Sequence, residues 1–251
     1  MTLKININFK KTFVIAEAGV NHNGDVKLAE QLIDVAKENG ADAVKFQSFK
    51  AKRVISKFAK KVNYQKKSAK DHENQLAMLL KLELKYKDYV HLSRYAKMRK
   101  IHFLSTPKDI PSAKFLEKID MPLYKIGSSE VNNFGFLKYI ASTGKPIILS
   151  TGMSTLGEVE DAIMIIRSKS DAQLTLLHCV SQYPCNIDQV NLKAIKTMEM
   201  AFGLHTGYSD HTIGYDAVLA AVSLGARIIE KHFTLDKKME GPDHKISLEP
   251  A

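Results

Sequence analysis

The sequence predicts a single α/β domain over residues 1–251, folded as a (β/α)₈ barrel, on three observations. Short β-branched or aliphatic runs alternate eight times with longer amphipathic stretches. The length is close to the roughly 250 residues of one such barrel. No segment rich in Gly, Pro or Ser divides the chain. Strands separated by helices pair in parallel, and eight such units close into a barrel more readily than they form an open sheet.

The eight predicted strands are spread along the chain. They are Phe13–Ala16, Ala43–Phe46, His102–Ser105, Leu123–Ile126, Ile147–Ser150, Leu174–His178, His205–Tyr208 and Arg227–Lys231. Helical spacing is clear after the first strand, in Leu28, Leu32, Ile33, Val35 and Ala36. Asp25 and Thr155 precede helical patterns as N-caps, and Gly40 is expected to follow the end of the first helix.

The eighth predicted strand is not followed by a helical pattern. The residues after His232 read FTLDKKMEGPDHKISLEPA, so we expect the eighth helix of the barrel to be absent. An open doubly wound sheet is the alternative architecture. The chain lacks the GxGxxG turn that would support the dinucleotide-binding form of that sheet.

Composition limits the class of protein. With 45% hydrophobic and 25% charged residues, the chain matches a globular protein and excludes intrinsic disorder. No apolar run approaches the ~20 residues that span a bilayer, and the start lacks the apolar stretch of a signal peptide. Only Cys179 and Cys185 are present, which excludes a disulfide scaffold and a cysteine-rich zinc module. We therefore expect a cytoplasmic protein without membrane attachment.

The net charge of +10 comes largely from one segment. Residues 50–70 contain nine basic side chains, no acidic one, and the aromatics Phe58 and Tyr64. A charge run is most often a solvated face, and no nucleic-acid module can be recognised here. We therefore expect no nucleic-acid partner, with a groove that guides phosphates or sugar acids as the alternative.

Polar residues stand at every predicted strand end. In a (β/α)₈ barrel the catalytic groups lie at the carboxyl ends of strands and in the loops that follow. The residues there are Glu17, Lys45, Gln47, Ser105, Thr106, Lys125, Ser128, Ser150, Thr151, His178, Ser181, Tyr183, Ser209, His211, Lys231 and His232. Lysine is almost never fully buried unless it is paired. Lys45 and Lys125, within VKFQ and YKIGS, are therefore predicted to face an anion, with a structural ion pair as the alternative.

Two histidines end neighbouring strands. The imidazoles of His211 and His232 could meet around one metal ion, and imidazole suits Mn, Zn, Fe and Co, whereas Mg prefers oxygen. Glu17, on the strand that closes the barrel, could reach this metal through water or move a proton. A hydrogen-bonded histidine at a strand end is the alternative. For His22, in the loop NHNG, a structural and a functional role both stay open.

Nine ordered motifs between Phe13 and Pro250 carry a specific resemblance. They are IAEAGVNHNG, AVKFQSFKA, FLSTP, YKIGSSE, KPIILSTGMS, LLHCVSQYP, GYSDHTIGYDA, IEKHFTLD and GPDHKISLEP. In this order and spacing they closely resemble the N-acetylneuraminate (sialic acid) synthase family, which includes legionaminic and pseudaminic acid synthases. The resemblance implies a TIM barrel and a transferase. The implied reaction condenses phosphoenolpyruvate with N-acetylmannosamine or a diacetamido-trideoxy analogue, giving a nine-carbon 2-keto acid and phosphate.

The resemblance also implies roles for residues at matching positions. Phosphoenolpyruvate would be held by Lys45, Lys125, Ser128, Ser150 and Ser209, with Gln47, Thr106 and Ser181 nearby. The amino sugar would contact Glu130, Tyr183 and Asp243. A divalent metal, usually manganese with Mg²⁺ or Co²⁺ as alternatives, would be bound by His211 and His232, and Glu17 would work beside it.

The chain departs from the family pattern in two places. Family members generally continue through an eighth helix into an antifreeze-like domain, which in a domain-swapped dimer supplies an arginine to the partner's sugar site. This sequence ends before that region, and we expect a homodimer for the full-length form. Lys108, in FLSTPKD, stands where Phe is common.

Two other function classes are weighed against the synthase. A class I aldolase would use Lys45, Lys125 or Lys231 as the nucleophile that forms a Schiff base. A non-catalytic barrel that binds polyanions would use the basic segment 50–70. The motifs favour the synthase, and the sequences GPDHKISLEP and SQYP favour N-acetylmannosamine or the diacetamido sugar over the pseudaminic acid precursor.

Overall fold

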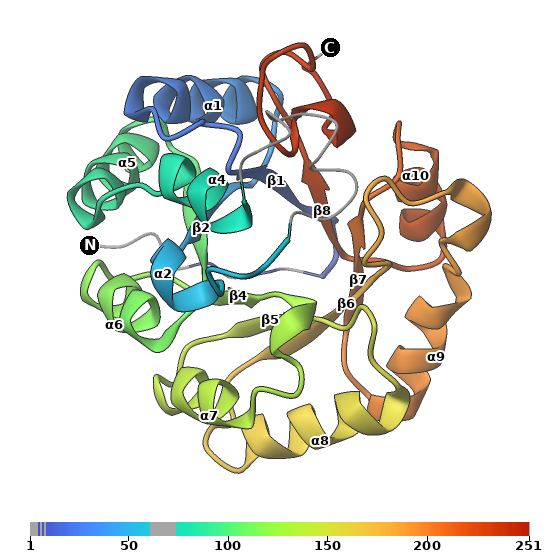
Figure 1. The fold of residues 1–251 in the computed structure, drawn as a ribbon. Coiled ribbons are helices and arrows are strands. Elements are labelled where there is room, and N and C mark those ends of the chain that lie inside the picture. The colour runs from blue at the N-terminus through green and yellow to red at the C-terminus, as the bar shows by residue number, and fades with distance from the viewer. Residues whose placement is uncertain (1–4, 6, 8, 61–73, 251) are drawn as a thin grey trace. The chain divides into compact units, whose positions relative to one another are not determined.

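The computed structural model describes residues 5, 7, 9–60 and 74–250. Its eight strands form one sheet in the order β3-β2-β1-β8-β7-β6-β5-β4 (Figure 1). The strands are β1 (Phe13–Gly19), β2 (Ala43–Ser48), β3 (His102–Pro107), β4 (Tyr124–Ile126), β5 (Ile147–Ser150), β6 (Leu174–Cys179), β7 (Thr206–Asp210) and β8 (Ile228–His232). Pairing is parallel between β2 and β3 and along the series from β4 to β8. All eight predicted strands are thus confirmed.

Several strands run further toward their carboxyl ends than predicted. The first strand continues to Gly19 and the seventh to Asp210. The apolar pattern stops at the first polar side chain, whereas the backbone ladder continues through polar residues that are themselves buried. The candidate residues Glu17 and Ser209 therefore lie within strands rather than in loops.

The chain divides into two compact units, which we describe separately. One comprises Met1–Ile15 and Met121–Lys231 and is called here the β4–β8 unit. The other comprises Ala16–Asp120 and His232–Ala251 and is called the β1–β3 unit.

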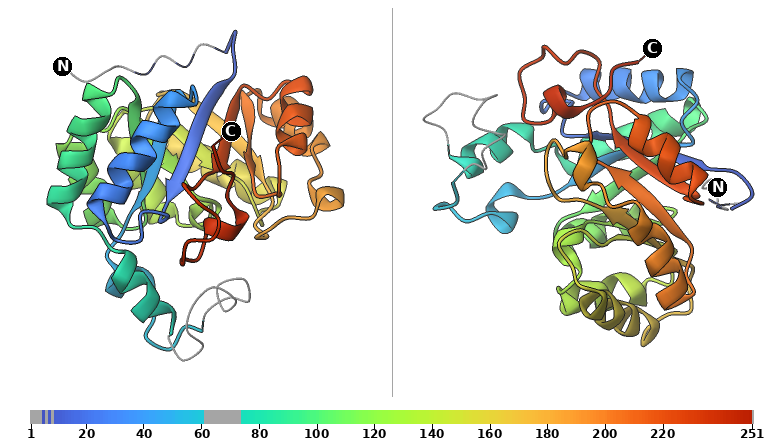
Figure 2. Two further views of the ribbon diagram at one scale, coloured as in Figure 1. Left: turned by 90° about the horizontal axis from the view of Figure 1, so that it is seen from above. Right: turned by 90° about the vertical axis from the view of Figure 1, so that its right-hand side faces the viewer.

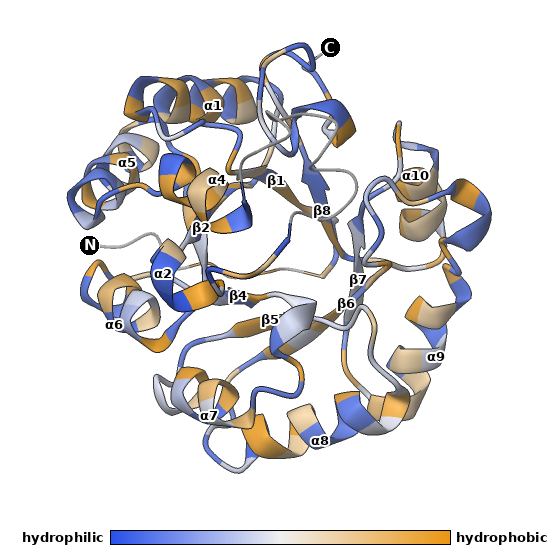
Figure 3. Cartoon of the chain, in the orientation of Figure 1, coloured by the Kyte–Doolittle hydropathy of each residue, from blue (hydrophilic) through white to orange (hydrophobic). Residues whose placement is uncertain are grey.

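In the β1–β3 unit, helix α1 (Val26–Glu38) packs against β2 and against α5 (Tyr86–Met98) (Figure 1). Apolar and polar bands alternate along α1 in Figure 3, and its buried residues include Leu32 and Ile33. The predicted N-cap is confirmed, because the Asp25 carboxylate accepts from the backbone of Lys27 at 2.7 Å. Gly40 follows the helix with φ +79°, the left-handed conformation that a residue with a side chain rarely adopts.

Three shorter helices complete the described part of this unit: α2 (Ala51–Val54), α4 (Gln75–Leu82) and α6 (Ile110–Lys118). Figure 2 shows α2 and α4 standing away from α1 and α5. Phe49, Met78 and Leu82 join them to the loop after β1 through a small apolar cluster. Gly24 lies in that loop, and a Cβ there would stand 2.3 Å from the Lys81 carbonyl oxygen, so only glycine fits.

The basic segment begins at α2. Lys50 pairs with Glu83 at 2.7 Å and lies 4.7 Å above the Tyr86 ring. The next four cations, Lys52, Arg53, Lys57 and Lys60, are exposed, as a solvated face requires. The other predicted members of the segment, Lys61, Tyr64, Lys66, Lys67 and Lys70, lie outside the described residues.

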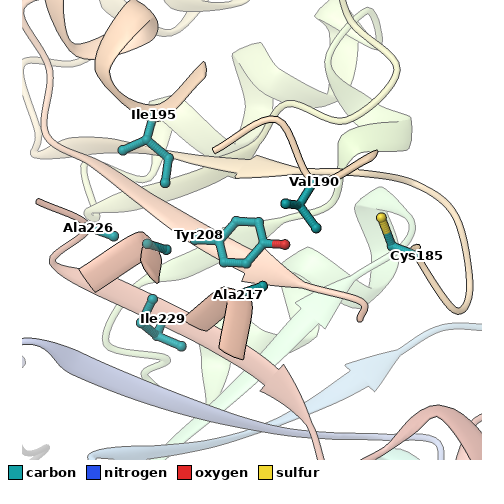
Figure 4. Close-up of a cluster of buried hydrophobic side chains, with 8 residues drawn as sticks. Cys185, Val190, Ile195, Tyr208, Ala217, Ala226 and Ile229 are labelled. Atoms are coloured by element: carbon teal, nitrogen blue, oxygen red, sulfur yellow. The ribbon is translucent and has the colours of Figure 1, made fainter. Parts of the chain in front are cut away.

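The β4–β8 unit carries α7 (Phe134–Ser142), α8 (Leu156–Arg167), α9 (Lys193–Phe202) and α10 (Asp216–Ser223). Thr155 caps α8 as predicted, forming a capping box with Glu158. Tyr208 lies at the centre of an apolar cluster with Ile195 of α9 and Ala217 of α10 (Figure 4). One face of β7 is thereby covered by helices.

After β8, the described residues up to Pro250 contain one short 3₁₀ turn, η3 (His244–Ile246), and no α-helix. The expectation that no helix follows the eighth strand is confirmed for these residues. Among the helices that the structure describes, none is both long and apolar enough to cross a membrane.

Candidate active site

Buried polar side chains gather at the carboxyl ends of the strands in each unit. In the β1–β3 unit, Lys45 Nζ lies 2.7 Å from Glu17 Oε2 and 3.0 Å from Thr106 Oγ1. Gln47 Nε2 donates to the other oxygen of Glu17 at 3.1 Å. Lys45 and Glu17 are 3% and 2% exposed. The structure thus brings these four predicted residues together, and Lys45 has the ion-pair partner that the sequence allowed as the alternative to a bound anion.

His232 lies beside this group. Gly19, at the end of β1, has φ +55°, and a Cβ there would stand 3.4 Å from both Glu17 Oε1 and Gln47 Nε2. The same Cβ would lie 3.6 Å from His232 Cε1. Glycine therefore leaves room for the three side chains, and Glu17 and His232 both lie close to the end of β1.

Asp243 is a buried carboxyl with an unusual acidity. Its pKa is raised from the usual 3.8 to about 7, chiefly by burial and then by the negative charge of Glu17, while the positive charge of Lys108 opposes the rise. Lys108, the departure from the family pattern, therefore acts electrostatically on a predicted sugar-binding residue. Near neutral pH, Asp243 can both give and take a proton.

His22 has a structural role in the loop after β1. Its side chain is fully buried, and Nδ1 accepts from the Gly24 backbone N–H at 3.0 Å. Burial lowers the pKa of His22 to about 4, so the ring is neutral. The neighbouring Asn21 donates to the Phe233 carbonyl at 2.7 Å and to Ser247 Oγ at 3.0 Å. The NHNG motif thus joins the loop after β1 to the segment after β8.

A second lysine cluster lies in the β4–β8 unit. Lys125 Nζ donates to Ser150 Oγ at 2.8 Å and lies 3.3 Å from Glu230 Oε1, which also accepts from Ser209 Oγ at 2.9 Å. All four side chains are buried. The sequence predicted three of them and missed Glu230. The signal was present, since Glu230 precedes His232 by two positions in a strand and so shares its face.

Two more predicted positions, Ser128 and Ser181, lie together around Gly152. Its backbone N–H donates to Ser128 Oγ at 2.8 Å, and Ser128 Oγ lies 3.0 Å from the Cys179 thiol. A Cβ at Gly152 would stand 2.4 Å from Ser181 Oγ, so these hydroxyls occupy the space that a side chain would take. Ser128, Ser181 and a backbone N–H therefore form a donor-rich surface suited to an anion.

Glu130 is held within its own turn, η1 (Ser128–Glu130). Its carboxylate accepts from Asn133 Nδ2 at 2.7 Å and from Ser129 Oγ at 3.1 Å. Its predicted contact with the sugar stays a prediction.

His211 has the hydrogen-bond pattern of a metal-binding histidine. Its Nδ1 lies 2.6 Å from the Val180 carbonyl oxygen, which can only accept, so Nδ1 carries the proton. Nε2 then has the lone pair and accepts from Tyr183 Oη at 2.9 Å. Metal-binding histidines usually donate their other N–H to such a carbonyl or carboxylate. The donor set therefore fits a divalent metal at Nε2.

A divalent metal at His211 would need ligands besides the described side chains. Among the described residues, no three His, Cys, Asp or Glu side chains are grouped closely enough to hold an ion. A metal held through imidazole would thus take further ligands from water or substrate, which is the open coordination of a catalytic site.

Comparison with known proteins agrees with this arrangement. The NeuB family model matches residues 32–251. An N,N'-diacetyllegionaminic acid synthase of Campylobacter jejuni is 54% identical over 244 residues, covering 96% of this chain and 73% of the relative. A protein of the same description from Legionella pneumophila is 48% identical over 243 residues, covering 95% and 68%.

A solved structure gives the same result for the fold. The N-acetylneuraminic acid (sialic acid) synthetase of Leptospira borgpetersenii, in complex with citrate, superposes with a TM-score of 0.87 at 34% identity, covering 100% of this chain and 85% of that chain. The predicted α/β TIM-barrel class is thereby confirmed. The chain is an enzyme of the sialic acid synthase type and belongs to the NeuB family.

Proposed function

We propose that this enzyme condenses phosphoenolpyruvate with an N-acylated amino sugar, giving a nine-carbon 2-keto acid and phosphate. One observation carries the proposal: two lysines at strand carboxyl ends, Lys45 and Lys125, are buried and paired with the carboxylates Glu17 and Glu230. A ligand with a carboxylate and a phosphate needs two such cationic positions. The names of the relatives, sialic and legionaminic acid synthases, support the same reaction.

The serine hydroxyls complete the proposed phosphoenolpyruvate contacts. Ser150 and Ser209 lie beside Lys125 and Glu230, while Ser128 and Ser181 lie with the Gly152 N–H. These hydroxyl and N–H donors can hydrogen-bond to the oxygens of phosphoenolpyruvate. They also stabilise the negative charge that develops on the phosphate as it leaves. The Lys125 ammonium has three N–H donors. One of them can therefore turn from Glu230 to the bound anion.

The reaction balances without a lysine nucleophile. The enol carbon of phosphoenolpyruvate attacks the aldehyde carbon of the open-chain sugar, forming the C–C bond, and the aldehyde oxygen takes a proton. Water then adds to the resulting oxocarbenium carbon and loses one proton. The C–O bond to phosphate then breaks, and the remaining hydroxyl proton passes to the departing phosphate, which leaves the 2-keto group. Glu17, whose carboxylate contacts Lys45 and Gln47, takes the proton from water in this proposal. Asp243, with its raised pKa, is suited to give the proton to the aldehyde oxygen.

We include a divalent metal, Mn²⁺ first, in this proposal. His211 Nε2 and His232 would hold it, and when bound it supplies Lewis-acid polarisation of the sugar aldehyde. Tyr183, which now donates to His211, would then be available to the sugar. A homodimeric full-length form and a cytoplasmic location, where phosphoenolpyruvate is made, belong to the same proposal.

The test is a panel of three sugars with phosphoenolpyruvate and Mn²⁺. We expect a 2,4-diacetamido-2,4,6-trideoxy sugar to be the best substrate, because the two relatives described above are N,N'-diacetyllegionaminic acid synthases. N-acetylmannosamine and the pseudaminic acid precursor complete the panel. Phosphate release and the mass of the nine-carbon product are measured. No sugar-dependent phosphate release with any of the three would contradict the proposal.

The aldolase alternative gives a clear negative prediction. A Schiff-base lysine needs a free amine, whereas all three candidate lysines form ion pairs. The carboxylate lies 2.7 Å from Lys45, 3.3 Å from Lys125 and 2.6 Å from Lys231. We therefore expect no mass increase when the enzyme is incubated with pyruvate and borohydride. Covalent labelling of any of the three lysines would favour the aldolase instead.

Asp243 predicts a pH dependence. Its pKa near 7 means that the proton donor is lost as the pH rises through neutrality, so kcat/KM should fall on the alkaline side. Asp243→Asn should lower kcat by about 10²-fold or more and remove this limb of the profile. The control is Asp216→Asn on the exposed first turn of α10, which should keep the profile of the wild type. An unchanged alkaline limb in Asp243→Asn would assign it to another group.

A further inference from the structure

A buried ion pair lies behind the loop that carries His211. Alternate residues of a strand face opposite sides of a sheet. Ser209 and Glu230 are register partners on one face of β7 and β8, where they belong to the Lys125 cluster. Asp210 and Lys231 are the next register partners and therefore lie on the other face.

Helices cover that other face. Tyr208 precedes Asp210 by two positions, shares its face, and packs with Ile195 of α9 and Ala217 of α10 (Figure 4). Lys231 Nζ lies 2.6 Å from Asp210 Oδ2, with side chains 8% and 0% exposed. Lys231 is thus turned away from the face that holds the predicted substrate contacts, although the sequence made it a candidate nucleophile.

The carboxylate of Asp210 is fully used. Its Oδ1 accepts from Tyr208 Oη at 3.0 Å and from the Thr212 N–H at 2.9 Å. Its Oδ2 accepts from Thr212 Oγ1 at 3.0 Å and from Lys231 Nζ at 2.6 Å. Lys231 Nζ also donates to the Thr212 carbonyl oxygen. The pair therefore fixes the residues on both sides of His211.

The backbone of His211 is held from the other side as well. Its carbonyl oxygen accepts from the Cys185 N–H at 2.8 Å, and Cys185 and Thr212 form a parallel bridge. The imidazole then donates from Nδ1 to the Val180 carbonyl oxygen at 2.6 Å. With both neighbours of His211 fixed, the direction of Nε2 is fixed too.

We propose that the Lys231–Asp210 pair positions the His211 imidazole, and that Lys231 is a positioning residue rather than a nucleophile. The metal part of this inference rests on the proposed function. A buried ion pair is weak evidence for stability, because well-packed apolar residues in its place are often as stable or more so. Its contribution here is geometric: no apolar pair could donate to and accept from Thr212 at the same time.

The test compares three variants for Mn²⁺ affinity, measured calorimetrically without substrates. Lys231→Met should weaken Mn²⁺ binding at least tenfold. This is the smallest loss of metal affinity usually seen when a residue that orients a metal ligand is replaced. Lys231→Met with Asp210→Asn leaves no unpaired buried charge, so its melting temperature should recover while the affinity stays reduced. Lys145→Met is the control, because Lys145 Nζ also donates to a carbonyl, that of Met121 at 2.6 Å, but just before the amino end of β5. It should bind Mn²⁺ as the wild type does.

A second readout needs no metal. The NMR signal of the His211 Nδ1 proton is assigned as the one that disappears in His211→Ala. This proton should exchange slowly with solvent in the wild type and faster in the double variant. Wild-type Mn²⁺ affinity in the folded double variant, or an unchanged proton signal, would overturn the positioning role. If the wild type binds no Mn²⁺ at all, the metal in the proposed function fails, and the proton signal still decides this inference.

Discussion

Replacing Lys125 by Met is expected to weaken phosphoenolpyruvate binding without a matching effect on the sugar. A charge-assisted contact contributes about 1.5–3 kcal/mol, which corresponds to a rise of roughly ten- to a hundredfold in the apparent KM for phosphoenolpyruvate. The KM for the amino sugar should change far less, because Lys125 lies among Ser150, Ser209 and Glu230, and the two serines are predicted to contact phosphoenolpyruvate and not the sugar. Steady-state kinetics with each substrate varied in turn measures both constants.

Stability has to be separated from binding in that experiment. Lys125→Met leaves Glu230 as a buried carboxylate without its lysine, and removing one partner of such a pair costs about 3–5 kcal/mol. The double variant Lys125→Met/Glu230→Gln removes that charge, so its melting temperature should recover. Its KM for phosphoenolpyruvate should stay raised. A KM that recovers together with the melting temperature would make Lys125 a structural residue.

The strand framework could be predicted because its signals are local. An apolar run followed by a helical pattern needs only neighbouring residues, and so do caps such as Asp25 and Thr155. Lys45 and Lys125 could be predicted as candidates because their signal is also local. A lysine inside an apolar strand is unusual, whatever residue it pairs with.

The partners of these residues could not be predicted, because the chain brings them together from distant positions. Asn21 bonds to Phe233 across 212 positions, and nothing near Asn21 in the sequence indicates this. Glu230 is similar, since the pairing of Lys125 with it depends on where β4 and β8 lie in the sheet. Lys231 shows the opposite error: its place at a predicted strand end made it a candidate nucleophile for the aldolase alternative, whereas strand alternation turns its side chain to the other face.

Replacing His211 and His232 together by Ala is expected to remove bound Mn²⁺ and to abolish activity. The two imidazoles are the proposed protein ligands, and no group of three or more potential ligand side chains exists elsewhere in the described residues to take their place. EDTA should likewise abolish activity of the wild type, and Mn²⁺ should restore it.

His178→Ala is the matched control, because His178 is also a buried histidine at a strand end. Its Nε2 donates to the Val190 carbonyl at 2.7 Å, and its ring stacks on Tyr208 under the helices. That variant should lose stability and keep its metal. Metal content is measured after dialysis. A double variant that holds as much Mn²⁺ as the wild type would show that His211 and His232 are not the metal ligands.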